Sequence, residues 1–384
     1  MRDFTKMTNR IITSSESAPL KVVLVGAGSM GKAWVKAIGE NPAVKLVAIA
    51  DLIPESAAAA AQELLPQKVA IGSDFLKLAR ENEADSIINV TVPVAHLPVT
   101  VSALLNGFPV LSEKPIAENI SQSIRLAAAA DFSQELLMVS QSRRWNPQLF
   151  LLRNMVMALG ENGMLNCQFH KGPRFGGFRD EMDYVLLIDM AIHMFDSARF
   201  LLNTNAKSVY CQSFNPEWSW YKGDAAANVL FDMENGSKIN FSGTWCNDQN
   251  ETSWDSSWLY LGAKGSATWD GENNPRFYSD SAIYDKSTIE GKGISAALEV
   301  FRVALNDGTE PMGEVRENIH SLAMVEGALI SAQRKQSVEI SEVFQLGIAD
   351  ALAQENNSKL IEIIETWNKN GFNFTAKTSQ GVSR

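Results

Sequence analysis

Lys114, Asp189 and His193 are the residues of this sequence whose types and spacing best suit proton transfer. Lys114 stands in the tripeptide Glu113-Lys114-Pro115, just after an apolar run, where an ammonium group can stabilise a developing negative charge. Asp189 and His193 are four residues apart and would share one face of a helix, and a histidine is a natural proton acceptor near neutral pH. Each signal alone also fits a loop ion pair or a helix-surface hydrogen bond.

A glycine-rich hexapeptide marks a candidate phosphate-binding turn. It consists of Gly26, Ala27, Gly28, Ser29, Met30 and Gly31, between a β-branched run and a helix-compatible stretch. In a strand–turn–helix unit, such glycines permit the turn, admit a pyrophosphate close to the backbone and allow close helix–strand packing. The N-terminus of the helix then presents unpaired N–H groups to the anion. The structural alternative is a plain strand–helix turn.

Asp51 favours NAD as the dinucleotide. It follows the next apolar run about 20 residues after the glycines, where a carboxylate binds the ribose hydroxyls and repels the 2′-phosphate of NADP. The next residues, Leu52, Ile53 and Pro54, include no arginine that could receive that phosphate. NADP is therefore the less favoured cofactor, although Asp51 could also serve only as a helix cap.

Elements that would position these residues follow two patterns. Up to about residue 140, strands that are apolar on both faces alternate with helices, which indicates a doubly wound parallel sheet. After a linking helix over 148–159, alternating apolar and polar residues indicate a large, mostly antiparallel sheet with one open face. The predicted strands are 21–25, 44–50, 69–71, 86–90, 109–111, 136–140, 164–170, 227–233, 238–245 and 258–261, and the predicted helices are 29–40, 54–65, 74–81, 96–106, 120–130, 189–202 and 315–333.

Composition excludes several classes of protein. The 384 residues suggest two domains, and no stretch approaches the roughly 18 apolar residues of a membrane span. A net charge of −10 disfavours bulk binding to nucleic acid. Three cysteines and four scattered histidines match no metal pattern and fit a reducing cytoplasm. We therefore expect a cytoplasmic protein with a small-molecule substrate and no metal, nucleic-acid or membrane partner.

The order and spacing of these motifs resemble the Gfo/Idh/MocA family, which comprises glucose–fructose oxidoreductase, inositol dehydrogenase and related enzymes. The resemblance spans residues 21–340 and includes the stretches 93–96, 141–147 and 325–332. It implies a Rossmann domain joined to an α+β domain, in which Lys114 contacts substrate and nicotinamide, His193 accepts the hydroxyl proton and Asp189 orients the substrate or the base. The cofactor contacts expected with it come from Thr91, Pro93, His96 and Glu113. For His96, a structural role at the start of its helix is the alternative.

The resemblance leaves the substrate open. The residues before Asp189 lack the glycine-rich stretch common in the family, and Ala191 replaces a usual glycine. We expect aromatic and arginine side chains to line the pocket, since rings suit the C–H faces of sugars and guanidinium suits hydroxyls or carboxylates. The candidates are Arg144, Trp145, Arg174, Phe178, Arg179, Tyr184, Trp218, Trp220 and Trp245, with Arg143 and Arg144 as possible bridges between the domains.

The predicted organisation has four parts. Residues 1–19 form a tail without the apolar core of a secretory signal, 20–145 the Rossmann domain, 146–340 the α+β domain and 341–384 a helical extension. The open sheet face predicts a homodimer or homotetramer. The leading function is NAD-dependent oxidation of a sugar, cyclitol or related polyol. Two alternatives remain: an NAD-dependent glycosidase that oxidises transiently and eliminates, and a non-catalytic dinucleotide sensor.

Overall fold

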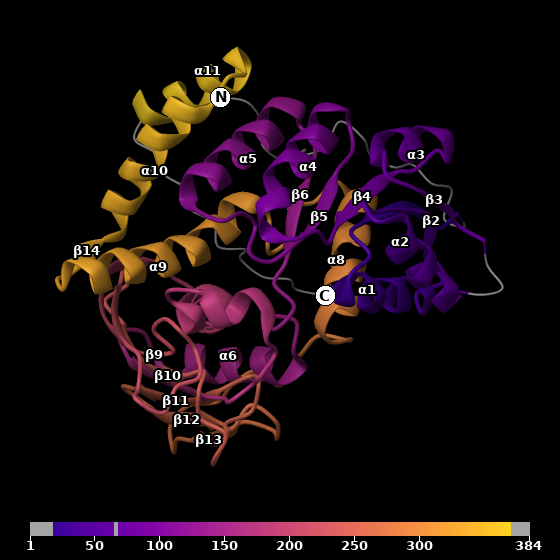
Figure 1. The fold of residues 1–384 in the computed structure, drawn as a ribbon. Helices are drawn as coiled ribbons and strands as arrows, with labels where there is room; N and C mark the ends of the chain where they lie inside the picture. The colour runs from indigo at the N-terminus through magenta and orange to yellow at the C-terminus, as the bar shows by residue number, and fades with distance from the viewer. Residues whose placement is uncertain (1–17, 65–67, 370–384) are drawn as a thin grey trace. The chain divides into compact units, whose positions relative to one another are not determined.

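The computed structural model of the chain describes residues 18–64 and 68–369 (Figure 1). Most of the predicted tail, residues 1–17, lies outside the described residues. The fold divides into two compact units. In the described parts, the first unit contains residues 18–142, 292–319 and 347–369, and the second contains 143–291 and 320–346.

The first unit has the predicted doubly wound parallel sheet. Its strands follow the order β3-β2-β1-β4-β5-β6, with every pair parallel. Strands β4, β5 and β6 are buried on both faces because helices pack on both sides of the sheet. Their carboxyl ends line one edge, where ligands bind in this topology. The strands are β1 (Leu20–Val25), β2 (Val44–Ala50), β3 (Ala70–Gly72), β4 (Ser86–Asn89), β5 (Val110–Glu113) and β6 (Leu137–Ser140).

Helices of this unit begin where the local sequence satisfies their first turn. Pro54 and Pro93 occupy first-turn positions, and the carboxylate of Asp74 accepts a hydrogen bond from the backbone N–H of Lys77. The helix predicted from His96 therefore begins three residues earlier, at Pro93. The helices are α1 (Ser29–Gly39), α2 (Pro54–Ala61), the 3₁₀ turn η1 (Gln62–Leu64), α3 (Phe75–Glu81), α4 (Pro93–Leu105) and α5 (Ile120–Ser133).

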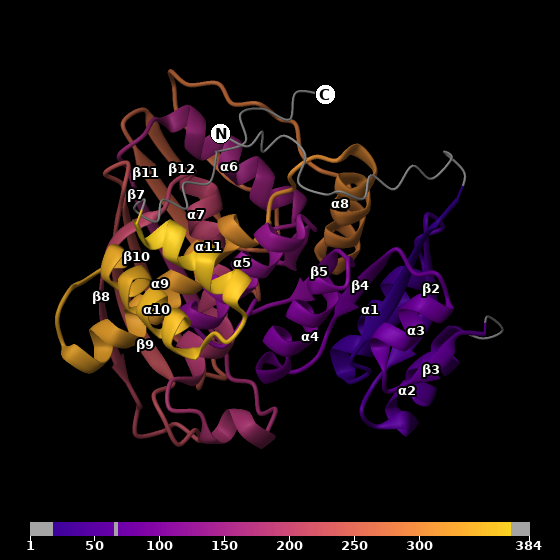
Figure 2. The ribbon, with the colours of Figure 1, turned by 90° about the horizontal axis from the view of Figure 1, so that it is seen from above.

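Later segments of the chain complete the first unit. Helix α8 (Gly293–Asp307) packs against α1 and β6, and α11 (Ser358–Lys369) packs along α5 (Figure 2). Arg125 of α5 donates a hydrogen bond to Glu355 at 2.7 Å. Residues 292–319, predicted to belong to the second domain, belong to the first unit by their contacts, because α8 packs on α1 and on β6 of the Rossmann sheet.

The second unit contains the predicted mostly antiparallel sheet. Its order is β13-β12-β11-β7-β10-β9-β8-β14, and only β7 and β10 run parallel. Buried and exposed residues alternate, as in β9, so one face is apolar. The strands are β7 (Met164–His170), β8 (Ala206–Phe214), β9 (Ala226–Met233), β10 (Lys238–Thr244), β11 (Ser257–Gly262), β12 (Gly265–Trp269), β13 (Arg276–Tyr278) and β14 (Val338–Glu339).

Helices α6 and α7 pack against each other beside this sheet, and Phe195 of α7 contacts Phe231 and Phe241 edge-on at 4.8 and 5.4 Å. The predicted α-helix from Asp189 is wrong at its start. Leu186–Ala191 form a π-helix, η3, and α7 begins at Ile192. The remaining helices are α6 (Pro147–Leu159), α7 (Ile192–Leu202), the 3₁₀ helix η2 (Gly177–Glu181), α9 (Val315–Arg334) and α10 (Ile340–Gln354).

Candidate active site

The glycine-rich turn leaves its backbone open to a ligand. Gly26 has φ +99°, and a Cβ there would lie 2.6 Å from the carbonyl oxygen of Val90. A Cβ on Gly31 would collide with the Gly26 carbonyl, whereas one on Gly28 would meet nothing within 4 Å. Gly28 is the N-cap of α1, and no side chain at this position accepts a hydrogen bond from the first N–H groups of the helix. Space and N–H groups in front of Ser29 and Met30 therefore suit a pyrophosphate.

Asp51 joins the glycine turn to the end of β2. Its Oδ2 accepts a hydrogen bond from the N–H of Ala27 at 2.7 Å, and its Oδ1 accepts one from the N–H of Ile53 at 2.8 Å. Each carboxylate oxygen has a second lone pair for a ribose hydroxyl. The predicted ribose-binding residue and the phosphate cradle are thus brought together.

Thr91 and His96 lie at the start of α4, next to the loop after β5. The imidazole of His96 is completely buried, with Nδ1 2.7 Å from the carbonyl oxygen of Pro115 and Nε2 3.0 Å from that of Thr91. The Thr91 hydroxyl donates to Asn89 at 2.7 Å. Burial lowers the pKa of His96, with a smaller effect from Lys114. His96 therefore holds two loops in place rather than presenting its ring to solvent.

Glu113 occupies the last position of β5 and is also internal. Its Oε1 accepts a hydrogen bond from the indole of Trp34, and its Oε2 accepts one from the backbone N–H of Lys114. Burial raises the pKa of Glu113, against the effects of Trp34 and Lys114. Lys114, joined to Pro115 by a cis peptide bond, is half-buried. Glu113 and the carbonyl of Pro115 thus fix the backbone on both sides of this lysine.

In the second unit, Asp189 is held by Arg179. The Nε and Nη2 atoms of Arg179 donate to the two carboxylate oxygens at 2.7 and 3.3 Å. This two-point pair fixes the carboxylate orientation, and the π-helix carries it one turn before His193. The guanidinium also lies over the rings of Phe178 and Phe175.

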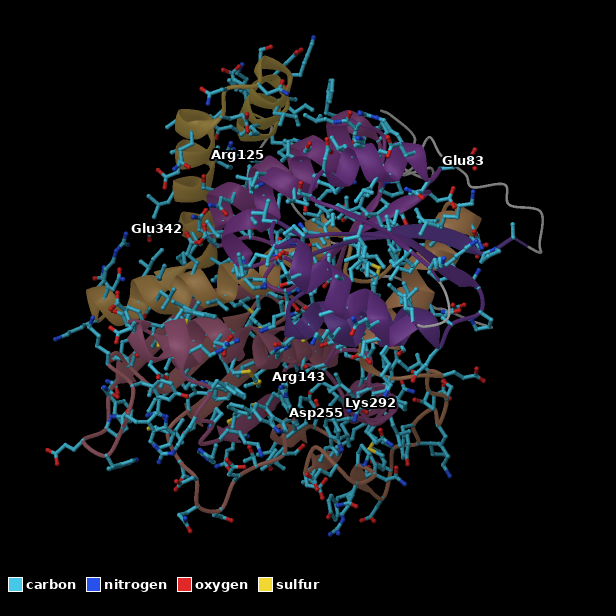
Figure 3. The ribbon with its side chains drawn as sticks, turned by 45° about the vertical axis from the view of Figure 1, so that its right-hand side comes forward. Glu83, Arg125, Arg143, Asp255, Lys292 and Glu342 are labelled. Atoms are coloured by element: carbon cyan, nitrogen blue, oxygen red, sulfur yellow. The ribbon has the colours of Figure 1, made fainter. Side chains whose placement is uncertain are left out.

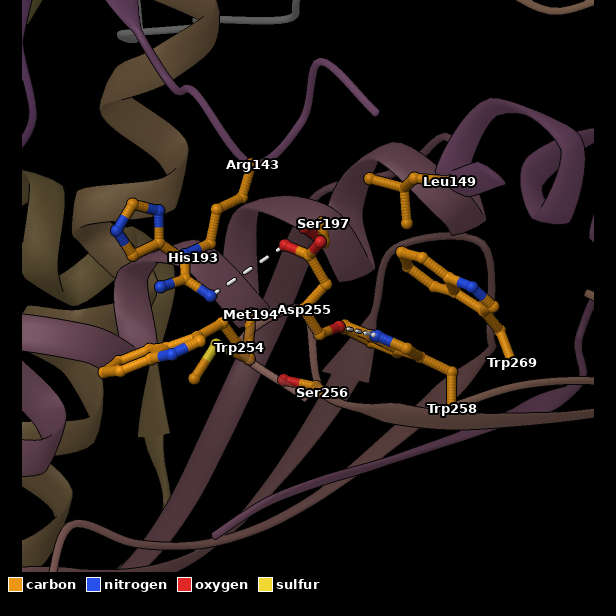
Figure 4. Close-up of a pocket in the computed structure, with 10 residues that line it drawn as sticks. All are labelled: Arg143, Leu149, His193, Met194, Ser197, Trp254, Asp255, Ser256, Trp258 and Trp269. Atoms are coloured by element: carbon orange, nitrogen blue, oxygen red, sulfur yellow. Dashed lines mark hydrogen bonds and ion pairs between the residues drawn. The ribbon is translucent and has the colours of Figure 1, made fainter. Parts of the chain in front are cut away.

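His193 lines a cavity in the second unit (Figure 4). Arg143 and Asp255, whose side chains lie together in Figure 3, approach to 3.9 Å between Nη1 and Oδ1. The guanidinium of Arg143 lies 5.4 Å from the ring centre of Trp254 and beside the imidazole. The cavity brings together a proton acceptor, a cation, a carboxylate and an aromatic face.

Other predicted substrate residues divide into internal and surface positions. Arg144 is 2% exposed and donates to the carboxylate of Asp196, with Nε 2.9 Å from Oδ2, so its donors are committed within the fold. Trp145 and Trp245 belong to the core. Exposed Arg174 stacks on half-buried Trp220 at 3.7 Å. Tyr184 is half-buried, and Phe178 and Trp218 are exposed.

Sequence reasoning missed Trp254 and Asp255, and it did not assign Arg143 to a cavity. Trp254 and Asp255 lie in the loop after β10, and no spacing pattern relates them to His193.

Among the described residues, no group of acidic, histidine and cysteine side chains could hold a metal ion. No helix of the described chain is long and apolar enough to cross a membrane.

Comparison with known proteins identifies the family. Residues 20–141 match the model of the oxidoreductase family with an NAD-binding Rossmann fold, and residues 156–268 match the Gfo/Idh/MocA C-terminal domain. Together they cover more than half of the chain. The protein therefore belongs to the Gfo/Idh/MocA oxidoreductases, as the motifs indicated, and its first unit contains an NAD-binding Rossmann domain.

Individual relatives agree with this assignment. "Uncharacterized protein y4oX" of Sinorhizobium fredii is 28% identical over 85% of this chain and 97% of its own length. Inositol 2-dehydrogenase 4 of Saccharopolyspora erythraea is 29% identical over 50% of this chain and 56% of its own. The crystal structure of an Agrobacterium radiobacter oxidoreductase, in complex with NAD⁺, L-tartaric acid and magnesium, superposes with a TM-score of 0.75 at 19% identity, covering 85% of this chain and 99% of that one.

Proposed function

We propose that this protein is an NAD-dependent dehydrogenase that oxidises a hydroxyl-bearing carbon of a sugar, cyclitol or related polyol. Two observations support the proposal: the first unit has an open glycine turn with Asp51 bonded to it, and the second unit has an Asp189 fixed by Arg179 and a His193 that lines a cavity. A bound NAD supplies the hydride acceptor. The Saccharopolyspora relative is named as an inositol dehydrogenase, which supports a polyol substrate.

Each catalytic side chain has a distinct role in this proposal. Lys114 donates to the substrate oxygen and stabilises the negative charge that develops on it. His193 takes the hydroxyl proton as general base. Asp189, held by Arg179, orients the substrate or the base. The carbinol carbon thereby loses a hydride and its oxygen a proton, which leaves a carbonyl.

We propose NAD rather than NADP as the cofactor. Asp51 places a carboxylate at the end of β2, with both oxygens already oriented by backbone N–H groups. A 2′-phosphate there would face this negative charge. The NAD⁺ in the Agrobacterium structure supports this preference.

Turnover of the purified full chain tests the function. Sugars and cyclitols are screened for reduction of NAD at roughly 340 nm, where NADH absorbs, with NADP in parallel. We expect net NADH formation with at least one substrate, which distinguishes a dehydrogenase from a glycosidase that returns the hydride. Lys114→Ala should abolish turnover while NAD still binds. Unchanged turnover in this variant would refute the role of Lys114.

We also propose a homo-oligomer through the open sheet face. Leu230, Leu261 and Phe214 are exposed on strands of the second unit, and such surface favours association. Light scattering after gel filtration should give a dimer or tetramer, and Leu230→Glu should dissociate it. A monomeric wild-type protein would contradict this proposal.

A further inference from the structure

Arg143 is the cation of the cavity beside His193. Its guanidinium lies between the imidazole of His193 and the indole of Trp254 in Figure 4, and all three side chains line the same cavity. The side chain is 20% exposed. A ligand that reaches His193 therefore meets this guanidinium.

The described part of the fold leaves one nitrogen of this guanidinium without a hydrogen bond. Its Nη1 atom is buried and makes no hydrogen bond to any residue that the structure describes. The nearest carboxylate oxygen of the ion pair with Asp255 is 3.9 Å away, which exceeds hydrogen-bond length. Burial lowers the pKa of Arg143, and this effect outweighs the opposite effects of Asp255 and Asp189. The guanidinium is thus largely buried, with Asp255 at ion-pair distance and an Nη1 atom that has no hydrogen-bond acceptor among the described residues.

The two neighbouring carboxylates have other partners. Asp189 accepts two hydrogen bonds from Arg179, and Oδ2 of Asp255 accepts one from the side chain of Asn146 at 2.9 Å. A second buried cation, Lys171, lies 5.1 Å from the ring centre of Trp254 and pairs with Glu251 at 2.8 Å. The described acidic side chains around Trp254 are therefore matched by basic ones, and no excess of negative charge is present there to repel an anion.

We propose that Arg143 binds a carboxylate group of the substrate, so that the oxidised molecule is a polyhydroxy acid such as an aldonate or a uronate. A carboxylate presents two oxygens to the planar N–H groups of a guanidinium and supplies the missing negative charge, whereas a hydroxyl supplies an acceptor without charge. Because Arg143 and His193 share one cavity, the carboxylate lies within a few bonds of the oxidised carbon. This inference rests on the proposed function for its site and deepens it by naming the substrate class.

Binding measurements test the inference without turnover. The full chain, saturated with NAD, is titrated calorimetrically with aldonates and uronates, such as D-gluconate and D-galacturonate, and with the neutral sugars of the same stereochemistry. We expect at least one acid to bind ten times more tightly than its neutral counterpart or better. Equal binding across the panel, or no binding by any acid, would overturn the inference.

Variants connect the preference to the guanidinium. Arg143→Met should weaken binding of the preferred acid about 10- to 100-fold, the range of a lost charge-assisted hydrogen bond, and leave binding of the neutral sugar within about twofold. Arg143→Lys keeps the charge and should give an intermediate loss. Arg276→Met, an exposed position on β13, is the matched control. Wild-type affinity for the acid in Arg143→Met would refute the assignment.

The outcomes separate this inference from the proposed function. If neutral polyols reduce NAD while acids neither bind nor react, the dehydrogenase function is supported and the carboxylate site is refuted. If an acid binds through Arg143 but no panel member yields NADH, the carboxylate site is supported and the dehydrogenase function is refuted. Should Arg143→Met fail to fold, the acid-to-neutral ratio of the wild-type protein and the Arg143→Lys variant still decide the question.

Discussion

The indole Nε1 of Trp34 lies 2.9 Å from Oε1 of Glu113 and donates a hydrogen bond to it, although the residues are 79 positions apart in the chain. Trp34 belongs to α1, whose N-terminus forms the phosphate cradle, and Glu113 precedes Lys114. This single bond ties the cofactor-binding helix to the strand end that positions the lysine. Both residues are buried.

Trp34→Phe should therefore lower the free energy of unfolding by about 1.5–3 kcal/mol, because it removes a donor from a buried carboxyl group. We also expect a lower kcat, since the backbone at Lys114 is less firmly held. Urea unfolding and steady-state kinetics measure the two effects. Trp145→Phe is the matched control for stability, because the buried Nε1 of Trp145 makes no hydrogen bond to the described residues. Equal losses in both variants would contradict a special role for the Trp34 bond.

Asp51→Ser should reduce the preference for NAD over NADP. The change removes the charge that opposes a 2′-phosphate, and we expect the ratio of kcat/KM for the two cofactors to fall about tenfold or more, as for the loss of one unfavourable charge contact. Asp51→Asn removes the charge but keeps one side-chain oxygen that can accept a hydrogen bond from the backbone. It therefore distinguishes the effect of the charge from that of the hydrogen bonds to the N–H groups of Ala27 and Ile53. A ratio that stays constant in both variants would remove Asp51 from cofactor selection.

The folded-state pKa of His96 should lie below its ordinary value of 6.5, because burial disfavours the charged form of the imidazole. A lowered folded-state pKa contributes stability above 6.5 that is lost as the pH falls toward the folded value. Nitrogen chemical shifts of the imidazole between pH 5 and pH 8 report its state directly. A midpoint at or above 6.5 would show that the two facing carbonyls stabilise the cation instead.

Glu314 should make stability fall as the pH rises. It is fully buried before α9, and burial raises its pKa from 4.5 to about 7, although Arg316 opposes this shift. A raised folded pKa contributes stability that is complete below 4.5 and is lost as the pH rises to about 7. The change amounts to about 3.5 kcal/mol, from a shift of about 2.5 pKa units at about 1.4 kcal/mol per unit.

Glu314→Gln isolates this contribution. Unfolding free energies of wild type and variant, measured in urea from pH 4.5 to pH 8, should differ by an amount that changes across the window and then levels off above about 7. Parallel curves for the two proteins would show that Glu314 does not titrate in that range.

Local pattern predicted the bounds of two strands with a clear arrangement of apolar residues. Strand 44–50 and strand 164–170 have the predicted bounds, because runs of β-branched and alternating residues define them. Strands β12 and β13 were missed because they are short and contain few β-branched residues. Helix α8 was missed for a different reason: its start at Gly293 has no capping side chain that would mark a helix N-terminus.

Residue type located the site more reliably than it assigned roles. The glycine turn and Asp51 come together because adjacent βα units meet at one sheet edge. His96 and Arg144 have the right chemistry for contact with a ligand, yet tertiary burial commits their polar atoms to Thr91, Pro115 and Asp196. Trp254 and Asp255 depend on a loop conformation, which has no periodic signature.

The return of α8 and α11 to the first unit has a consequence for biosynthesis. A ribosome releases the six parallel strands long before it releases the two helices that pack on α1, β6 and α5. Until then, the nascent Rossmann sheet keeps apolar surface in contact with water, and such surface recruits chaperones or promotes aggregation. Dividing the gene after codon 142 would thus yield an unfinished half rather than an autonomous nucleotide-binding module.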